Sequence, residues 1–210
     1  MLTLIKREIR DHVVYFFAAV IFSSILISIS LTPIFESRRH YRLLSGLGTV
    51  ITITAIVIFG FFAMGVGQMY TDKNRKISAF LSTLPVSRSR ILIARIVTGT
   101  LAILTLIVPQ VIVTIILLRL YAPPVPVYSG FIAEVFAGIF LTAFACYCIG
   151  LQAGWSSSSI VPAMGGFGLT CILVSLILIK GFGLHIIVIL ILFIIASLIR
   201  IRHLFTSTPL

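Results

Sequence analysis

Six long apolar stretches, separated by short charged or proline- and glycine-containing links, constrain the fold of this chain more than any other feature. A helix that crosses a bilayer needs about 20 apolar residues, each adding a rise of about 1.5 Å. The pattern predicts spans at about Val13–Ile34, Thr49–Met69, Ile91–Leu118, Gly130–Leu151, Ile160–Ile179 and Leu184–Leu198. We therefore predict an all-α polytopic membrane protein in which residues 1–210 form a single transmembrane domain.

The composition favours a membrane environment. The chain is 60% apolar and 10% charged, with a mean hydropathy of +1.22, whereas a soluble domain carries about 25% charged residues. The net charge of +11 gathers at the ends of the apolar stretches. That placement is typical of topology signals and of contacts with anionic headgroups. We expect membrane lipids, and not nucleic acid, to be the partners of these charges.

The positive charges also predict an orientation. Six spans put both termini on one side of the membrane, and eleven of the 16 Lys and Arg residues then fall on that side. The positive-inside rule therefore predicts a multi-pass protein of the plasma membrane with both termini in the cytoplasm. Arg38, Arg39 and Arg42 fall on the external side. They form a solvated rim, meet anionic headgroups, or contact an anionic substrate.

The residues needed for covalent chemistry are sparse and scattered. No Gly-x-x-x-x-Gly-Lys-Ser/Thr sequence is present, so this chain is not expected to bind ATP through a P-loop. Cys146 and Cys148 are two residues apart and point to nearly opposite faces of a helix, so they cannot share a metal ion. We predict no catalytic residue, no metal site and no cofactor bound by this chain.

A polar, basic segment between the second and third spans predicts a cytoplasmic helix over residues 72–84. Pro85 ends this helix, because the residue before a proline avoids the helical conformation. Its apolar residues recur at helical spacing between charged ones, which is the pattern of a helix that docks on another protein. The residues of this expected interface are Asp72, Lys73, Arg75, Lys76, Ile77, Phe80, Leu81 and Leu84.

The first twelve residues predict a second amphipathic element. Apolar residues such as Leu4 alternate with the charged residues Lys6, Arg7 and Arg10. This pattern suits a helix that lies in the inner interface of the membrane before the chain turns into the first span. The alternative is that these residues extend the first span.

Polar residues inside the predicted spans allow two interpretations. Gln110 in the third span, and Ser24 and Ser28 in the first, either support helix packing or line a path for a substrate. Among them, Gln110 is the strongest candidate for a substrate contact.

Two segments together give the chain a family resemblance. They are Leu4-Ile-Lys-Arg-Glu-Ile-Arg-Asp11, and Asp72-Lys-Asn-Arg-Lys76 followed by Phe80-Leu-Ser-Thr-Leu-Pro-Val-Ser-Arg88 and Ile91-Leu-Ile-Ala-Arg95. With the six-span layout, they resemble the permease subunits of type 2 ABC exporters. The resemblance implies an N-terminal interfacial helix, a coupling helix at 72–84, two separate ATPase subunits that bind ATP and Mg²⁺, and a second, identical or related permease subunit.

One departure from that family bears on the substrate. Many members carry a re-entrant hairpin between spans five and six. The link here is about Lys180–Gly183; its two glycines predict a tight external turn, and it is too short for a hairpin. The resemblance therefore implies a minimal exporter of a small amphipathic, lipid-like or peptide substrate. The alternatives are a membrane-embedded lipid-modifying enzyme, which needs convergent His, Asp or Glu residues, and a membrane scaffold without transport activity.

Overall fold

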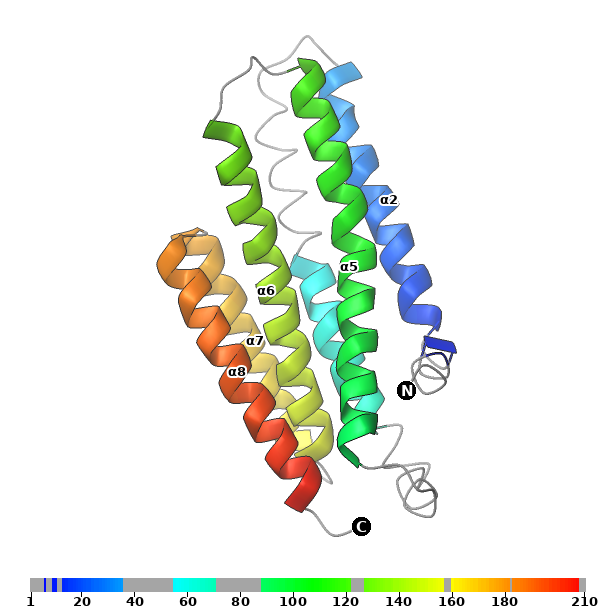
Figure 1. The fold of residues 1–210 in the computed structure, drawn as a ribbon, viewed down its shortest axis with the longest axis vertical. Coiled ribbons are helices and arrows are strands. Elements are labelled where there is room, and N and C mark those ends of the chain that lie inside the picture. The colour runs from blue at the N-terminus through cyan, green and yellow to red at the C-terminus, as the bar shows by residue number, and fades with distance from the viewer. Residues whose placement is uncertain are drawn as a thin grey trace.

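The computed structural model of the protein describes residues 6, 9–10, 13–35, 55–70, 88–121, 127–156, 160–181 and 183–207. Within these residues the chain forms six long helices and no strand, which confirms the predicted helical class. The helices are α2 (Val13–Phe35), an unlabelled helix at Ala55–Tyr70, α5 (Arg88–Tyr121), α6 (Val127–Ser156), α7 (Ile160–Lys180) and α8 (Leu184–Ser207) (Figure 1).

The helices run up and down in a single bundle, with the start of α2 and the last residue of α8 towards the same end (Figure 1). We call this the lower end. The helix Ala55–Tyr70 ends there and α5 begins there, so both flanks of the 71–87 link lie at the lower end. The opposite end, here the upper end, carries the last residues of α2, α5 and α7. Arg119 and Lys180 lie towards it.

Three described helices are long and apolar enough to cross a membrane: Ser89–Leu117, Ala133–Trp155 and Leu184–Leu204. The apolar parts of the other helices, Val13–Ile29, Ala55–Tyr70 and Val161–Ile177, are shorter. Large apolar side chains also cover the outward faces of α2, α7 and α8; Val14 is 76% exposed and Ile179 is 80% exposed. Apolar surface of this kind requires hydrocarbon or a protein partner around it. These features indicate a membrane protein, while the number of six spans stays a prediction.

Several helices extend beyond the predicted spans. α5 starts three residues earlier and ends three residues later than the 91–118 span, and it continues through Pro109. The helix α8 runs to Ser207, whereas the predicted span ends at residue 198. Charged side chains such as Arg200 and Arg202 are compatible with a continuing helix because their heads can extend towards water. A window based on hydropathy ends the span at these charges, although the backbone helix continues.

The turn between α7 and α8 was predicted from its glycines and has the expected geometry. Gly181 has a φ of +73°, a left-handed conformation that glycine adopts without a steric penalty. Its N–H donates to the carbonyl oxygen of Ile177 at 2.8 Å and so closes the last turn of α7. The carbonyl oxygen of Gly183 accepts bonds from the N–H groups of Ile186 and Ile187, which starts α8.

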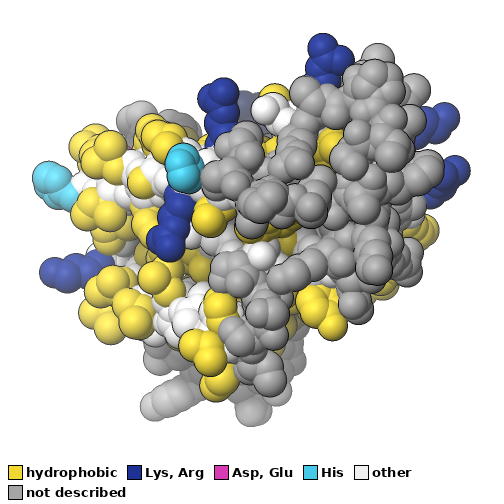
Figure 2. All heavy atoms as spheres, turned by 90° about the horizontal axis from the view of Figure 1, so that it is seen from below, with side chains coloured by type: hydrophobic (Ala, Val, Ile, Leu, Met, Phe, Trp, Pro, Cys, Tyr) yellow, Lys and Arg dark blue, Asp and Glu magenta, His cyan; other side chains and the backbone are white. Residues whose placement is uncertain are grey.

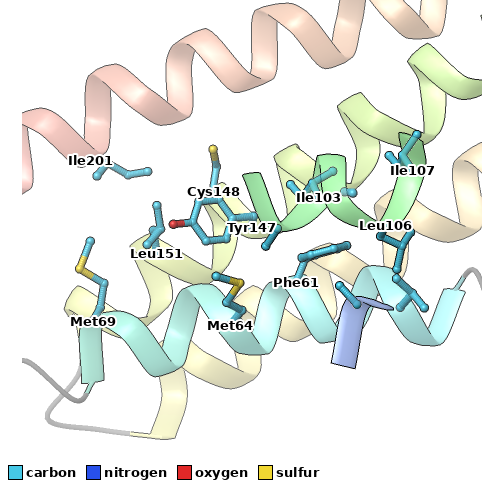
Figure 3. Close-up of a cluster of buried hydrophobic side chains, with 14 of the residues drawn as sticks. Phe61, Met64, Met69, Ile103, Leu106, Ile107, Tyr147, Cys148, Leu151 and Ile201 are labelled. Atoms are coloured by element: carbon cyan, nitrogen blue, oxygen red, sulfur yellow. The ribbon is translucent and has the colours of Figure 1, made fainter. Parts of the chain in front are cut away.

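The helix α6 lies at the centre of the bundle. It packs against α5, α7 and α8. Its residues from Ala145 to Leu151 are buried on all sides, as expected for a helix surrounded by others. Residues of α6 belong to each of the three clusters of buried apolar side chains. The first of these clusters also includes Phe61, Met64 and Met69 from the helix Ala55–Tyr70 (Figure 3).

Candidate functional site

A buried polar network lies in the lower half of the bundle and is centred on Tyr147 of α6. The Tyr147 hydroxyl lies 2.6 Å from Oε1 of Gln68 and 2.9 Å from the main-chain oxygen of Arg95. It carries one proton and donates it to one of these acceptors at a time. Nη1 of Arg95 donates to the thioether sulfur of Met69 at 3.1 Å. The network therefore connects three helices through side chains.

The members of this network are almost completely shielded from solvent. Arg95 and Gln68 are each 1% exposed and Tyr147 is fully buried. Nε2 of Gln68 is buried and has no hydrogen-bond partner among the described residues. A charged side chain within an apolar bundle is energetically expensive, and such residues in membrane proteins usually mark functional positions. We therefore take this network, rather than a surface cleft, as the first part of the candidate site.

Members of the network come from the two helix ends that border the 71–87 link. Gln68 and Met69 belong to the last turn of the helix Ala55–Tyr70, and Arg95 belongs to the second turn of α5, which starts at Arg88. These two helix ends flank the 71–87 link. Both ends contact the Tyr147 hydroxyl of α6, which donates to one of them at a time.

Glycines bring these helices unusually close together. A Cβ atom on Gly65 would lie 2.5 Å from the main-chain oxygen of Tyr147, and one on Gly150 would lie 2.2 Å from that of Phe62. A Cβ on Gly99 would overlap the Tyr147 ring at 2.3 Å. Small residues at such crossings let helix backbones approach closely in membranes. The Tyr147 ring is consequently enclosed between α5 and the helix Ala55–Tyr70, close to Met64 (Figure 3).

A second part of the candidate site is a partly open cavity above the network. It has a volume of about 200 Å³ and lies between α2, the helix Ala55–Tyr70, α5 and α6. Its walls are apolar apart from Gln110, which follows Pro109 in α5. The apolar lining residues include Leu26, Phe61 and Phe136. The sequence-predicted Gln110 thus lines an interior space that can hold a small apolar group.

The structure does not bring Ser24 and Ser28 to this cavity. Both side chains are exposed on the outward face of α2. Their hydroxyls donate to the main-chain oxygens of Val20 and Ser24, each four residues earlier, at 2.9 Å. Ser23 of α2 is buried instead, and its Oγ has no hydrogen-bond partner within the described parts of the chain.

The other predicted site residues fall mostly outside the described residues. These are Leu4 and Arg7, the external group Arg38, Arg39 and Arg42, and the whole 72–84 helix with Asp72, Lys73, Arg75, Lys76, Ile77, Phe80, Leu81 and Leu84. Lys6 and Arg10 are described; both are helical and exposed. In the part of the chain that the structure describes, no three His, Cys, Asp or Glu side chains are placed to hold a metal ion.

Arg95 is a buried residue of the site that the sequence does not predict. Its charge beside an apolar stretch predicts a cytoplasmic topology signal, although it also stands in the motif Ile91-Leu-Ile-Ala-Arg95. The chain contains a signal for the burial of Arg95, because this residue stands four residues after Ile91 and three before Thr98, on the stripe of α5 that becomes buried.

No protein-family model, curated protein or solved structure matches this chain.

Proposed function

We propose that this chain is the permease subunit of an ATP-driven exporter, and that it does no covalent chemistry of its own. Two copies, or this chain and a related one, flank the pathway in the plasma membrane. Two separate ATPase subunits bind ATP and Mg²⁺ and dock under the 72–84 helices at the lower end of the bundle. The substrate is small and amphipathic, lipid-like or peptidic.

The observation that carries the proposal is the network around Tyr147. An ATP-driven permease needs a rigid connection between the segment that an ATPase moves and the helices that line the pathway. Gln68 and Arg95 stand on the two sides of the 71–87 link, and both contact the Tyr147 hydroxyl. Gly65 and Gly99 also bring the same three helices into direct contact, which leaves little space for one helix to move without the others. In the proposed exporter, a movement of the 71–87 link is therefore transmitted to α5, α6 and the helix Ala55–Tyr70.

The charges at the lower end support the orientation that the proposal requires. Lys6, Arg10, Arg90, Arg200 and Arg202 are exposed near this end. Figure 2 views this end and shows Lys and Arg side chains around its margin, with no acidic side chain among the coloured residues. An excess of positive charge favours the cytoplasmic side. In the proposed exporter, the lower end therefore faces the cytoplasm and its ATP.

The cavity with Gln110 gives the proposal a place for the substrate. Its position between α2, the helix Ala55–Tyr70, α5 and α6 lies directly above the network. A space of about 200 Å³ receives part of a substrate, such as the end of an apolar chain or a side chain. Gln110 then supplies an amide that can bond a polar group of the substrate. Movement of the three coupled helices changes the shape of this space.

The decisive experiment places a charge on the expected docking face. Phe80→Asp puts a carboxylate among Ile77, Leu81 and Leu84, whereas Ala79→Asp puts the same charge on the opposite side of the predicted helix. Co-purification from cells that express the full chain with its ATPase measures assembly, and ATP hydrolysis in reconstituted vesicles measures coupling. We expect Phe80→Asp to abolish both and Ala79→Asp to preserve both. Unchanged assembly and hydrolysis with Phe80→Asp would refute the proposal.

A further inference from the structure

An amphipathic groove opens between α7 and α8 at the lower end of the bundle. It has a volume of about 420 Å³ and its floor is formed by Ile149, Gln152 and Ala153 of α6. Both α7 and α8 pack on α6, and their upper parts share a cluster of buried side chains that includes Ile177 of α7 and Leu190 of α8. Their divergence below the Gly181 turn leaves the groove between them. The exporter proposal makes no use of it.

The polarity of the groove changes along its length. Arg200 of α8 lies at its lower part, and the main-chain oxygen of Ser197 accepts a bond from Nε2 of Gln152 at 3.3 Å. Above these groups, Leu169 of α7 and Phe193 of α8 form apolar walls. From Phe193 to Arg200 the lining of α8 spans seven residue steps, or about 10 Å at 1.5 Å per residue.

These dimensions fit within one leaflet of a bilayer. The hydrocarbon core of a membrane is about 30 Å thick, so the part of the groove above Arg200, about 10 Å long, covers about two thirds of one leaflet. Arg200 then lies at the level of the headgroups, where a guanidinium forms charge-assisted hydrogen bonds to a phosphate. Among the described residues the acidic one, Glu134, lies in the upper part of α6, far along the chain from the exposed Arg200. The positive charge of Arg200 at one end of an apolar groove favours an anionic partner.

We propose that this groove binds one anionic phospholipid of the lower leaflet. Its phosphate contacts Arg200, and an acyl chain lies between α7 and α8 against Leu169 and Phe193. The glycine pair Gly165 and Gly166 makes room for the chain. Gly166 faces α6, since a Cβ there would meet Ala153 at 3.0 Å, whereas a Cβ on Gly165 would meet no atom within 4 Å. This assignment does not depend on the proposed transport function.

Lipid retention tests the proposal. The full chain is placed in nanodiscs of equal parts phosphatidylglycerol and phosphatidylcholine and released into detergent, and the lipids that remain bound are counted by native mass spectrometry. We expect the original chain to prefer phosphatidylglycerol by about five-fold, which is the effect of about 1 kcal/mol from one basic residue near an anionic headgroup. Arg200→Gln removes this preference. Arg202→Gln, which changes the same charge outside the groove, keeps it.

A second pair of variants tests the place of the acyl chain. Gly165→Trp fills the groove and is expected to reduce retention of both lipids. Gly168→Trp is the matched control, because a Cβ there also meets no atom within 4 Å but the residue does not line the groove. If Gly165→Trp does not fold, Gly165→Leu takes its place. Equal retention in the two glycine variants, or equal loss with Arg200→Gln and Arg202→Gln, would overturn the assignment. Displacement of the lipid by inorganic phosphate alone would also overturn it.

Discussion

The close approach of α6 and the helix Ala55–Tyr70 makes a quantitative prediction about a pair of glycines. Gly60 and Gly65 lie on the same helix, but a Cβ on Gly60 meets no atom within 4 Å. On Gly65 the Cβ would lie 2.5 Å from the main-chain oxygen of Tyr147 and 2.9 Å from the main-chain nitrogen of Leu151. Both obstacles are backbone atoms, so a change of rotamer cannot relieve the overlap.

The magnitude follows from that geometry. The contact must lengthen from 2.5 to at least 3.0 Å, which separates the two helices by about 0.5 Å. A gap of about 0.5–1 Å forfeits a quarter to a half of the dispersion energy of the atoms concerned. Overpacking of this kind costs about 1–3 kcal/mol. The gain of about 0.5–1 kcal/mol from replacing a helical glycine by alanine is common to both variants and cancels in their difference.

Thermal unfolding in detergent measures the difference, with the native cysteines as reporters. Cys146 and Cys148 are fully buried in α6 next to this contact, so a thiol-reactive fluorogenic dye labels them when the bundle opens. At about 2–4 °C per kcal/mol for a chain of this size, Gly65→Ala should unfold roughly 2–12 °C below Gly60→Ala. Equal unfolding temperatures in the two variants would show that the helices are not in backbone contact at Gly65.

Three further predictions address the network, the cavity and the orientation. Tyr147→Phe leaves the buried acceptor on Gln68 without its 2.6 Å bond. The free energy of unfolding should therefore fall by about 1–3 kcal/mol, measured with the same dye. Tyr70→Phe, at an exposed position, is the control and should have no effect. If the chain is the proposed exporter subunit, Gln110→Leu should preserve co-purification of the ATPase but reduce export at least several-fold in reconstituted vesicles. Unchanged export would exclude Gln110 from substrate contact. Cysteines placed at Arg119 and Arg202, both exposed, should react with an impermeant maleimide from opposite sides of sealed vesicles. Labelling of both from one side would rule out the proposed orientation.

The helices and their turns were accessible from the sequence because they depend on local signals. A long apolar stretch predicts a helix because, inside a bilayer, a helix satisfies its backbone hydrogen bonds within its own segment. The Lys180–Gly183 link predicted a tight turn, and the left-handed Gly181 fulfils that prediction. Hydropathy nevertheless misplaced helix ends such as Ser207 of α8, because charged side chains end an apolar stretch without ending the helix.

Which face of each helix turns inward was decided by the tertiary structure. In a soluble helix the polar face identifies the surface, but a helix in lipid is apolar on all sides, so periodicity does not separate the packed face from the lipid face. For this reason Ser23 and not Ser24 is buried, and Arg95 enters the core beside Tyr147 instead of standing at the membrane surface. The amino-acid sequence by itself determined the number of long apolar helices. Their contacts, made at Gly65, Gly99 and Gly150, determined which polar groups meet.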